Sequence, residues 1–424
     1  MTTPPDRTVF PLPAASLSPF GAVLAVTFIN SVGTGVVTNG IFFLTDGPAF
    51  GFTRSQNYLL GVALGVTYVA AALGTSRLLI GLRRMFPSLG ARALLIMLMI
   101  GMGALCVIPR AAVHFAGPGG QPGAWSAWLL VCLYSPMAGV LWPLVEGYVS
   151  GGRSGASLRS AMGVWNVVWS SAIVLTYWGM SPLIRAHTVE TILALGVLHM
   201  AAIPLIMRFS ADLPPHVHEE HEPHPPVYED LMVTFRYLLP MSYLVSSALG
   251  PYLPGAMARL GVAEDWRAFL ATAWLVPRVF TFLAMQRWQG WHGRWWPAIL
   301  GGGLIVVGFG VCVLSPVLDG GRGGIAMMVI GLFMFGTGMA TVYSAALYYG
   351  MEVQRNEADA GGSHEGLIGL GYTVGPLIGF MASEAAVRGM LPEASFEPVM
   401  LGLVALIAAG VAGSVVRRVH RHTR

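Results

Sequence analysis

The sequence predicts an all-α integral membrane protein of twelve transmembrane helices, arranged as two pseudo-symmetric six-helix bundles. Three observations support this fold class. The charged fraction of the 424 residues is 10% and the mean hydropathy is +0.66, whereas a soluble chain usually carries about a quarter charged residues. The apolar runs are long enough to cross a bilayer, which takes roughly 20 residues per helix. One polar segment, at residues 212–230, divides these runs into two parts of similar length.

Apolar runs of that length occur twelve times, and each is a predicted transmembrane helix. In the first half they cover residues 18–44, 54–76, 92–114, 125–148, 160–182 and 189–208. In the second half they cover residues 233–257, 264–286, 297–317, 325–350, 362–385 and 398–416. We therefore expect an N-terminal six-helix half over residues 1–210, a central loop over residues 211–230 and a C-terminal six-helix half over residues 231–424.

The distribution of arginine predicts the orientation of the chain. The sequence has no lysine, and if both ends are cytoplasmic, sixteen arginines fall in cytoplasmic segments and seven on the opposite side. Cytoplasmic loops of membrane proteins carry the excess of positive charge. We therefore expect an integral cell-membrane protein with both termini and the central loop in the cytoplasm, and the bacterial inner membrane as its location.

Other protein classes are not supported by the sequence. Its arginines do not cluster on a soluble domain, as nucleic-acid binding requires. Cys106, Cys132 and Cys312 lie inside apolar spans and predict no disulfide framework. The N-terminus lacks the pattern of a removable signal peptide, so the first run is expected to remain as a helix. No H-E-x-x-H or serine-nucleophile motif is present. We expect no enzyme and no cofactor, and a monomer whose partners are a small-molecule substrate and the lipid bilayer.

An internal repeat relates the two halves, as in transporters built from two parallel six-helix units. A shift of 210 positions aligns Gly51 with Gly261 and continues through the helices that follow them. Apolar matches are common in membrane proteins, whereas matches of loop arginines and prolines are more specific. They pair Arg77 with Arg287, Arg84 with Arg294 and Pro87 with Pro297. We therefore expect the second and eighth helices at equivalent positions.

Twelve helices, a six-plus-six repeat, a long polar central loop and basic loops after the second and eighth helices resemble the major facilitator superfamily. The motif of that family after helix two combines glycine, an aspartate and basic residues. Here the stretch RLLIGLRRMFPSLGAR lacks the acidic residue but keeps Gly81, Arg83, Arg84, Gly90 and Arg92. The resemblance implies a secondary active transporter that works by alternating access of its two halves.

A glycine motif marks the eleventh predicted helix, in GLGYTVGPLIGF, and is similar to a glycine-proline motif of some superfamily antiporters. Gly371, Gly375 and Gly379 recur every four residues and so share one helix face, with Pro376 beside them. Small residues at this spacing let another backbone approach closely. The motif predicts tight helix packing, with which a gating role at the seam between the halves is compatible.

Arg278, in the eighth predicted span, is the most informative single residue. An ionisable side chain in hydrocarbon costs roughly 2.5–3.5 kcal/mol on insertion scales and therefore faces a partner or a water-filled cavity. Its guanidinium suits a carboxylate or phosphate of a substrate, and Pro277 can open the helix beside it. The alternative is a permanent structural pair with a buried acid. We favour the substrate role because the repeat-equivalent residue is the uncharged Tyr68.

Two carboxyl groups and a histidine are candidates for proton coupling. Glu365 follows His364 at the predicted start of the eleventh helix, and Glu146 lies near the end of the fourth. A partly desolvated carboxylate can exchange a proton during alternating access, and histidine titrates near neutrality. The alternative for His364 and Glu365 is a helix start in which the acid complements the helix dipole.

The remaining candidate substrate contacts are polar and aromatic residues within the spans. The resemblance implies a cavity between the halves, lined largely by the first, fourth, seventh and tenth helices. By helix position the candidates are Asn30, Trp142, Tyr243 and Tyr343, with Tyr372 of the eleventh helix. Asn166 joins them because a buried amide needs hydrogen-bond partners. Each has packing or an interhelical hydrogen bond as its alternative role.

The central loop contains a histidine-rich tract, made up of His216, His218, His221 and His224. Such tracts can bind nickel, zinc or copper, and the alternative is a solvated linker. The sequence thus leaves three functions open. The first is a proton-coupled transporter of a small anionic or zwitterionic organic solute. The others are a divalent transition-metal exporter with a metal-binding loop and a non-transporting membrane sensor.

Overall fold

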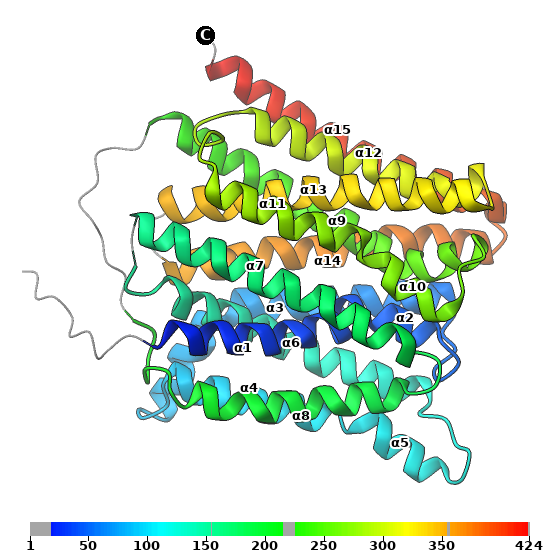
Figure 1. Cartoon of the computed structure of the whole chain (residues 1–424), viewed down its shortest axis with the longest axis horizontal. Helices are drawn as coiled ribbons and strands as arrows, with labels where there is room; N and C mark the ends of the chain where they lie inside the picture. The colour runs from blue at the N-terminus through cyan, green and yellow to red at the C-terminus, as the bar shows by residue number, and fades with distance from the viewer. Residues whose placement is uncertain (1–17, 154, 215–224, 354–356, 423–424) are drawn as a thin grey trace, which may run out of the picture.

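The computed structural model describes residues 18–153, 155–214, 225–353 and 357–422. In Figure 1 the helices lie side by side along one common direction, and α1 begins at the same end of the bundle at which α15 ends. We call this the terminal end and the opposite one the distal end. Helices of the first half (blue to green) lie mostly below those of the second half (green to red) in this view.

The helices of the first half follow the six predicted spans. They are α1 (Phe20–Gly33), a π-helical turn (Thr34–Asn39), α2 (Ile41–Asp46), α3 (Arg54–Met85), α4 (Ala91–Leu105), α5 (Ile108–Ala116), α6 (Ala124–Ser150), α7 (Gly155–Met180), a 3-10 turn (Ser181–Leu183) and α8 (Thr188–Ile206).

The helices of the second half also follow six predicted spans. They are α9 (Val227–Arg259), α10 (Glu264–Ala271), a 3-10 turn (Thr272–Trp274), α11 (Leu275–Arg287), α12 (Trp296–Leu318), α13 (Arg322–Val353), α14 (Glu357–Val387), a 3-10 turn (Glu393–Ser395) and α15 (Phe396–His422).

Eleven helical segments of the described chain are long and apolar enough to cross a membrane. The twelfth predicted span lies in α9, which is 33 residues long but more polar than the others. Its middle contains three prolines and several serines and tyrosines, which lower its hydropathy. The fold class predicted from the sequence, an all-α membrane protein with two six-helix halves, is confirmed.

Two spans are interrupted in the middle of the bundle. The first span changes from α-helix to a π-helical turn at Thr34, and Gly40 N donates to Gly35 O at 2.8 Å. The eighth span changes to a 3-10 turn at Thr272, just before α11 begins. Pro277 then falls in the first turn of α11, where its missing N–H leaves no hydrogen bond unmade. Helix irregularities of this kind often occur at functional sites.

The two halves pack against each other most closely along α3 and α14. A Cβ atom at Gly61 of α3 would lie 2.8 Å from Cβ of Pro376, and one at Gly65 would lie 2.6 Å from Cα of Thr373. Only glycine permits so short a separation of two helices. The seam between the halves is therefore lined by glycine on α3 and by the predicted glycine-proline motif on α14.

The glycines of α14 face different partners. A Cβ at Gly371 would lie 2.5 Å from Cβ of Tyr243, and one at Gly375 would overlap Leu244 O, so both glycines pack on α9 of the same half. A Cβ at Gly379 would overlap the ring of Tyr58 on α3, in the other half. The motif thus serves packing within the second half at two positions and packing across the seam at the third.

An ion pair and several hydrogen bonds join the two halves at the distal end. Arg54 Nη2 lies 2.5 Å from Glu393 Oε1, and Ser55 Oγ lies 2.8 Å from Ser383 Oγ. Ser181 Oγ donates to Asp265 O at 2.5 Å. These contacts hold the distal ends of the two halves together, so the structure is closed on that side.

Candidate functional site

A central cavity lies between the two halves. It has a volume of about 50 Å³, which is room for a few water molecules. Aromatic side chains make up half of its lining, and Arg278 and Glu365 are its two ionisable groups of opposite charge. The lining residues are Ser31, Thr34, Asn39, Tyr68, Trp142, Trp165, Trp169, Ile173, Tyr243, Ser246, Trp274, Arg278, Tyr343, Glu365, Ile368 and Tyr372.

Arg278 is buried in a cage of aromatic rings. It is 2% exposed, and its guanidinium carbon lies 4.3 Å from the ring centroid of Trp169. The rings of Trp274, Phe282 and Tyr343 lie at 5.4–5.5 Å. A guanidinium within about 6 Å of a ring centroid is attracted by the ring quadrupole. The cage therefore stabilises a charge that would otherwise be costly to bury.

The guanidinium of Arg278 keeps hydrogen-bonding capacity. Nη2 donates to the Tyr243 hydroxyl at 3.3 Å, whereas Nε has no partner. Among the residues that the structure describes, no carboxylate lies within 4.0 Å of this guanidinium. The alternative role considered above, a permanent ion pair with a buried acid, is therefore wrong for the described part of the chain.

Glu146, His364 and Glu365 come together although they lie far apart in the sequence. One side-chain oxygen of each glutamate and one ring nitrogen of His364 all lie within 4.8 Å of one another. The three side chains are 2%, 8% and 4% exposed. Glu146 belongs to the first half, and His364 and Glu365 belong to the second. We call these three residues the seam cluster.

The partners of the seam cluster are unevenly distributed. The Tyr68 hydroxyl donates to Glu365 Oε2 across the seam, and the His364 ring packs edge-on against Tyr343 at 5.2 Å. Within the described residues, Nε2 of His364 lacks a hydrogen-bond partner, and the carboxylate oxygens of Glu146 have none beyond a proton shared with the neighbouring Glu365 carboxyl group. The cluster thus presents unused acceptor atoms in a buried place.

The alternative in which His364 and Glu365 stand at the start of a helix is wrong. Helix α14 begins at Glu357, so Glu365 lies more than two turns inside it. Both side chains are buried. The predicted start of this helix was too late because residues 357–361 (EADAG) include two acids and no large apolar side chain, and the helix extends through them.

Tyr68 and Arg278, the repeat-equivalent pair, both line the central cavity. Tyr68 of α3 bonds Glu365, and Arg278 of α11 bonds Tyr243. The repeat therefore brings two different polar groups to corresponding places in the two halves.

The other predicted contacts divide into two groups. Trp142, Tyr243, Tyr343 and Tyr372 line the central cavity. Asn30 lines none of the three cavities described here, because its amide Nδ2 turns back onto Val26 O of its own helix at 2.9 Å. Asn166 faces a different cavity, nearer the terminal end, and its Oδ1 accepts from Trp169 Nε1 at 3.0 Å. The structure thus does not bring Asn30 and Asn166 to the central cavity.

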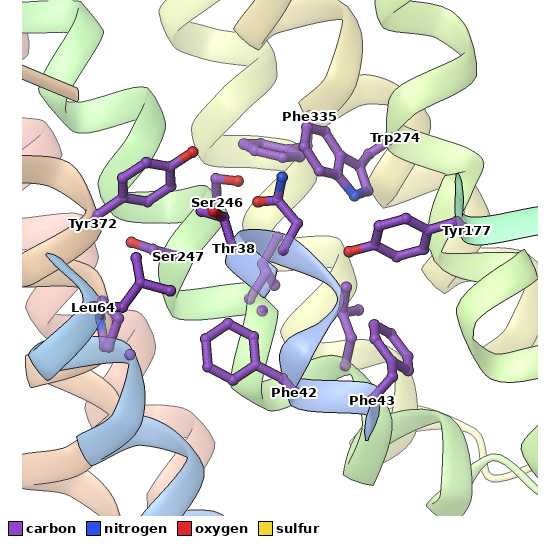
Figure 2. Close-up of a pocket in the computed structure, with 16 residues that line it drawn as sticks. Thr38, Phe42, Phe43, Leu64, Tyr177, Ser246, Ser247, Trp274, Phe335 and Tyr372 are labelled. Carbon is purple, nitrogen blue, oxygen red and sulfur yellow. The ribbon is translucent and has the colours of Figure 1, made fainter. Parts of the chain in front are cut away.

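A distal cavity of about 30 Å³ adjoins the central one and shares Asn39, Ser246, Trp274 and Tyr372 with it. Figure 2 shows the hydroxyls of Tyr372 and Tyr177 pointing inward from opposite sides of this cavity. Trp274 and Phe335 lie on one side of it, and Phe42 and Phe43 on the other. Six of the sixteen residues that line this cavity are aromatic, and they lie between the central cavity and the distal end.

A proximal cavity of about 210 Å³ lies between α7, α11 and α13 at the terminal end. Its polar residues include Arg159, Asn166, Gln286, His292 and Glu352. Burial lowers the pKa of His292 to about 4, and Arg159 acts in the same direction. His292 is therefore neutral at pH 7. The proximal cavity shares no lining residue with the central cavity.

Several residues of the central cavity were not predicted. They are Tyr68, Trp169, Trp274 and Ser31, whereas Trp165 and Ser246 were expected as polar or aromatic residues of the spans. Aromatic and small polar residues are common in membrane helices, so their identity alone carries little information. A stronger signal was the density of tryptophan in GVWNVVWS, which places Trp165 and Trp169 one helical turn apart on one face.

The predicted metal ligands of the central loop, His216, His218, His221 and His224, lie outside the described residues.

Comparisons with known proteins show the fold. No family model and no curated protein matches the sequence. Among solved structures, an aspartate-to-alanine variant of the nucleoside transporter NupG is similar to this chain, with a TM-score of 0.65 and 9% sequence identity. The match covers 93% of this chain and 99% of the NupG chain. A second structure of NupG gives a TM-score of 0.59 with 10% identity, over 93% of this chain and 98% of that one. The chain described here therefore shares the fold of this nucleoside transporter.

Proposed function

We propose that this protein is a secondary active transporter that moves a small anionic or zwitterionic organic solute by alternating access. The fold supports a transporter, because the solved structures that share it are of a nucleoside transporter. The cavity between the halves offers a binding place, and the contacts that close the distal end support alternating access, which requires a state closed on one side.

The proposed substrate class rests on the guanidinium of Arg278. Arg278 is a buried guanidinium in the wall of the central cavity, it has no acid beside it in the described chain, and its Nε is unpartnered. A carboxylate or phosphate of the substrate would accept the hydrogen bonds that this guanidinium does not make within the protein, since a guanidinium binds such groups in a bidentate manner. The eight aromatic rings of the lining favour a solute that also has a planar ring.

The expected coupling ion is the proton, held by the seam cluster. Two carboxyl groups this close cannot both be charged without repulsion, and burial adds a desolvation cost. A proton on the cluster relieves both costs. Because Glu146 and Glu365 belong to different halves, a change in protonation alters the energy of the seam as well.

The proposal includes the orientation inferred from arginine, with both termini cytoplasmic in the bacterial inner membrane, and a monomeric protein. A metal exporter is not favoured, since the similar structures are of a nucleoside transporter. A non-transporting sensor would bind the solute without exchanging it across a membrane.

Transport in liposomes tests the function. Purified protein should exchange labelled against unlabelled solute and accumulate the solute when a pH gradient is imposed, and a protonophore should abolish the accumulation. Glu365→Gln should keep exchange but lose accumulation. Exchange that is absent for a bound solute would support the sensor, and accumulation by Glu365→Gln equal to wild type would contradict the coupling role.

A further inference from the structure

We propose that the seam cluster is a binding site for one divalent transition-metal ion, such as Zn²⁺, Mn²⁺ or Co²⁺, held by Glu146, His364 and Glu365. The inference concerns binding, not export of the metal, and it does not depend on transport of an organic solute. It rests on the convergence of the three side chains and on their missing partners.

The ligand chemistry fits such an ion. Two carboxylates and one imidazole are donors that zinc, manganese and cobalt accept, and zinc sites with three protein ligands and one open position are common. The three ligand atoms lie within 4.8 Å of one another. At metal–ligand distances of about 2.0–2.2 Å, the ligand atoms of a tetrahedral ion are about 3.3–3.6 Å apart. Ligand pairs at the 4.8 Å limit must therefore approach by about an ångström, which rotations of the two glutamate side chains can supply.

The pattern of hydrogen bonds leaves a place for a metal cation. Nε2 of His364 is buried and has no partner in the described chain, and the buried oxygens of Glu146 have none beyond a proton shared with Glu365, which a metal ion would displace. A buried acceptor without a donor costs about 1–3 kcal/mol, and more if it is charged. A divalent cation between the two carboxylates would use these lone pairs and neutralise both charges.

The surroundings also suit an ion site. The Tyr68 hydroxyl, on α3, holds Glu365 Oε2 and so orients one ligand from outside, as groups around metal sites commonly do. Arg278, on α11, is engaged by the aromatic cage and by Tyr243 instead of by these acids. Glu365 also lines the central cavity, so the cluster borders that cavity.

The location has a mechanical consequence. One ligand comes from α6 in the first half and two come from α14 in the second. A bound ion would tie the halves together near the terminal end, in addition to the distal contacts that already join them. Metal binding should therefore stabilise a state in which the cluster is closed.

Metal binding to the purified full-length protein tests the site. The reference is a protein in which the four loop histidines are glutamine and which carries no histidine tag, so that the loop does not compete. Titration with Co²⁺, followed by visible absorption, and with Zn²⁺, followed by calorimetry, should give one ion per chain. Glu146→Gln and His364→Gln should each weaken binding at least about 100-fold, the upper end of the cost of losing even a supporting partner.

A matched control is Glu352→Gln, which removes an acid of the proximal cavity outside the cluster and should leave binding unchanged. Each variant is first checked by size-exclusion chromatography, and Glu365→Gln replaces any cluster variant that does not fold. The proposal is overturned if the reference protein binds no ion at 100 times the concentration of protein, or if binding survives Glu146→Gln and His364→Gln.

Discussion

At the scale of single residues, Arg278 shows what the sequence can and cannot reveal. A lone arginine in an apolar span is conspicuous, because its burial is costly. Its aromatic cage was not predicted, since the rings come from α7, α11 and α13 and the 3-10 turn before α11. Asn30, by contrast, was predicted to contact the substrate but does not line the central cavity. Its helix was correctly expected near the cavity, but the rotation of the helix and the amide bond to Val26 turn it away.

Arg278→Met should leave a folded protein that no longer binds substrate. Burying a charge costs several kcal/mol, and four ring contacts offset this only in part. Methionine has a similar length and no charge, so the thermal midpoint should stay within a few degrees or rise. Thermal unfolding in detergent measures this. An aggregated or strongly destabilised variant would show that Arg278 has a structural role instead.

Tyr68 and Glu365 should be energetically coupled because they bond across the seam. In a double-mutant cycle of Tyr68→Phe and Glu365→Gln, the stability changes should deviate from additivity by about 0.5–3 kcal/mol. Tyr148→Phe is the matched control, since the Tyr148 hydroxyl bonds Ser210 O and not an acid. Additive effects of Tyr68→Phe and Glu365→Gln would argue against the bond.

At the scale of elements, all twelve spans could be predicted, because each needs about 20 apolar residues whatever its neighbours. The interruptions at Thr34 and Thr272 could not. They depend on packing against other helices, which a single apolar run does not encode. The start of α14 was missed for a similar reason, since residues without large apolar side chains extend a helix beyond the hydrocarbon without changing the apolar pattern.

Gly375→Ala should destabilise the protein by about 1–3 kcal/mol, the usual cost of overpacking. The added methyl would overlap Leu244 O of α9, and backbone cannot move aside as a flexible side chain can. Gly402→Ala, on α15 with nothing within 4 Å of the added methyl, is the control. It should be neutral or stabilising by up to ~1 kcal/mol. Equal effects of the two substitutions would show that α9 and α14 are farther apart than described.

At the scale of the whole molecule, the sequence predicted the two halves but not which end of the bundle is closed. The repeat and the arginine pattern constrain topology, and they are the same in every conformation. The closed distal end depends on individual bonds, such as Arg54 with Glu393 and Ser55 with Ser383. These residues are far apart in the sequence, and nothing in their local pattern pairs them.

A disulfide across the distal end should lock the molecule. Ser55 and Ser383 belong to different halves and their hydroxyl oxygens are 2.8 Å apart, so Ser55→Cys with Ser383→Cys should cross-link under mild oxidation. Transport should stop on oxidation and return with reductant, and each single variant should be unaffected. Transport that continues in a fully cross-linked protein would contradict alternating access through the distal end.

The measurement that tests the central claim most directly is a thermal-shift screen of purified wild-type and Arg278→Met protein. The panel contains ring-bearing carboxylates, phosphate esters, zwitterions, neutral nucleosides and sugars. A ligand that binds the folded state raises its apparent stability. We predict that an anionic or zwitterionic ligand stabilises the wild type and not Arg278→Met. If only neutral ligands bind, or if the same anions stabilise both proteins equally, Arg278 is not the substrate anchor.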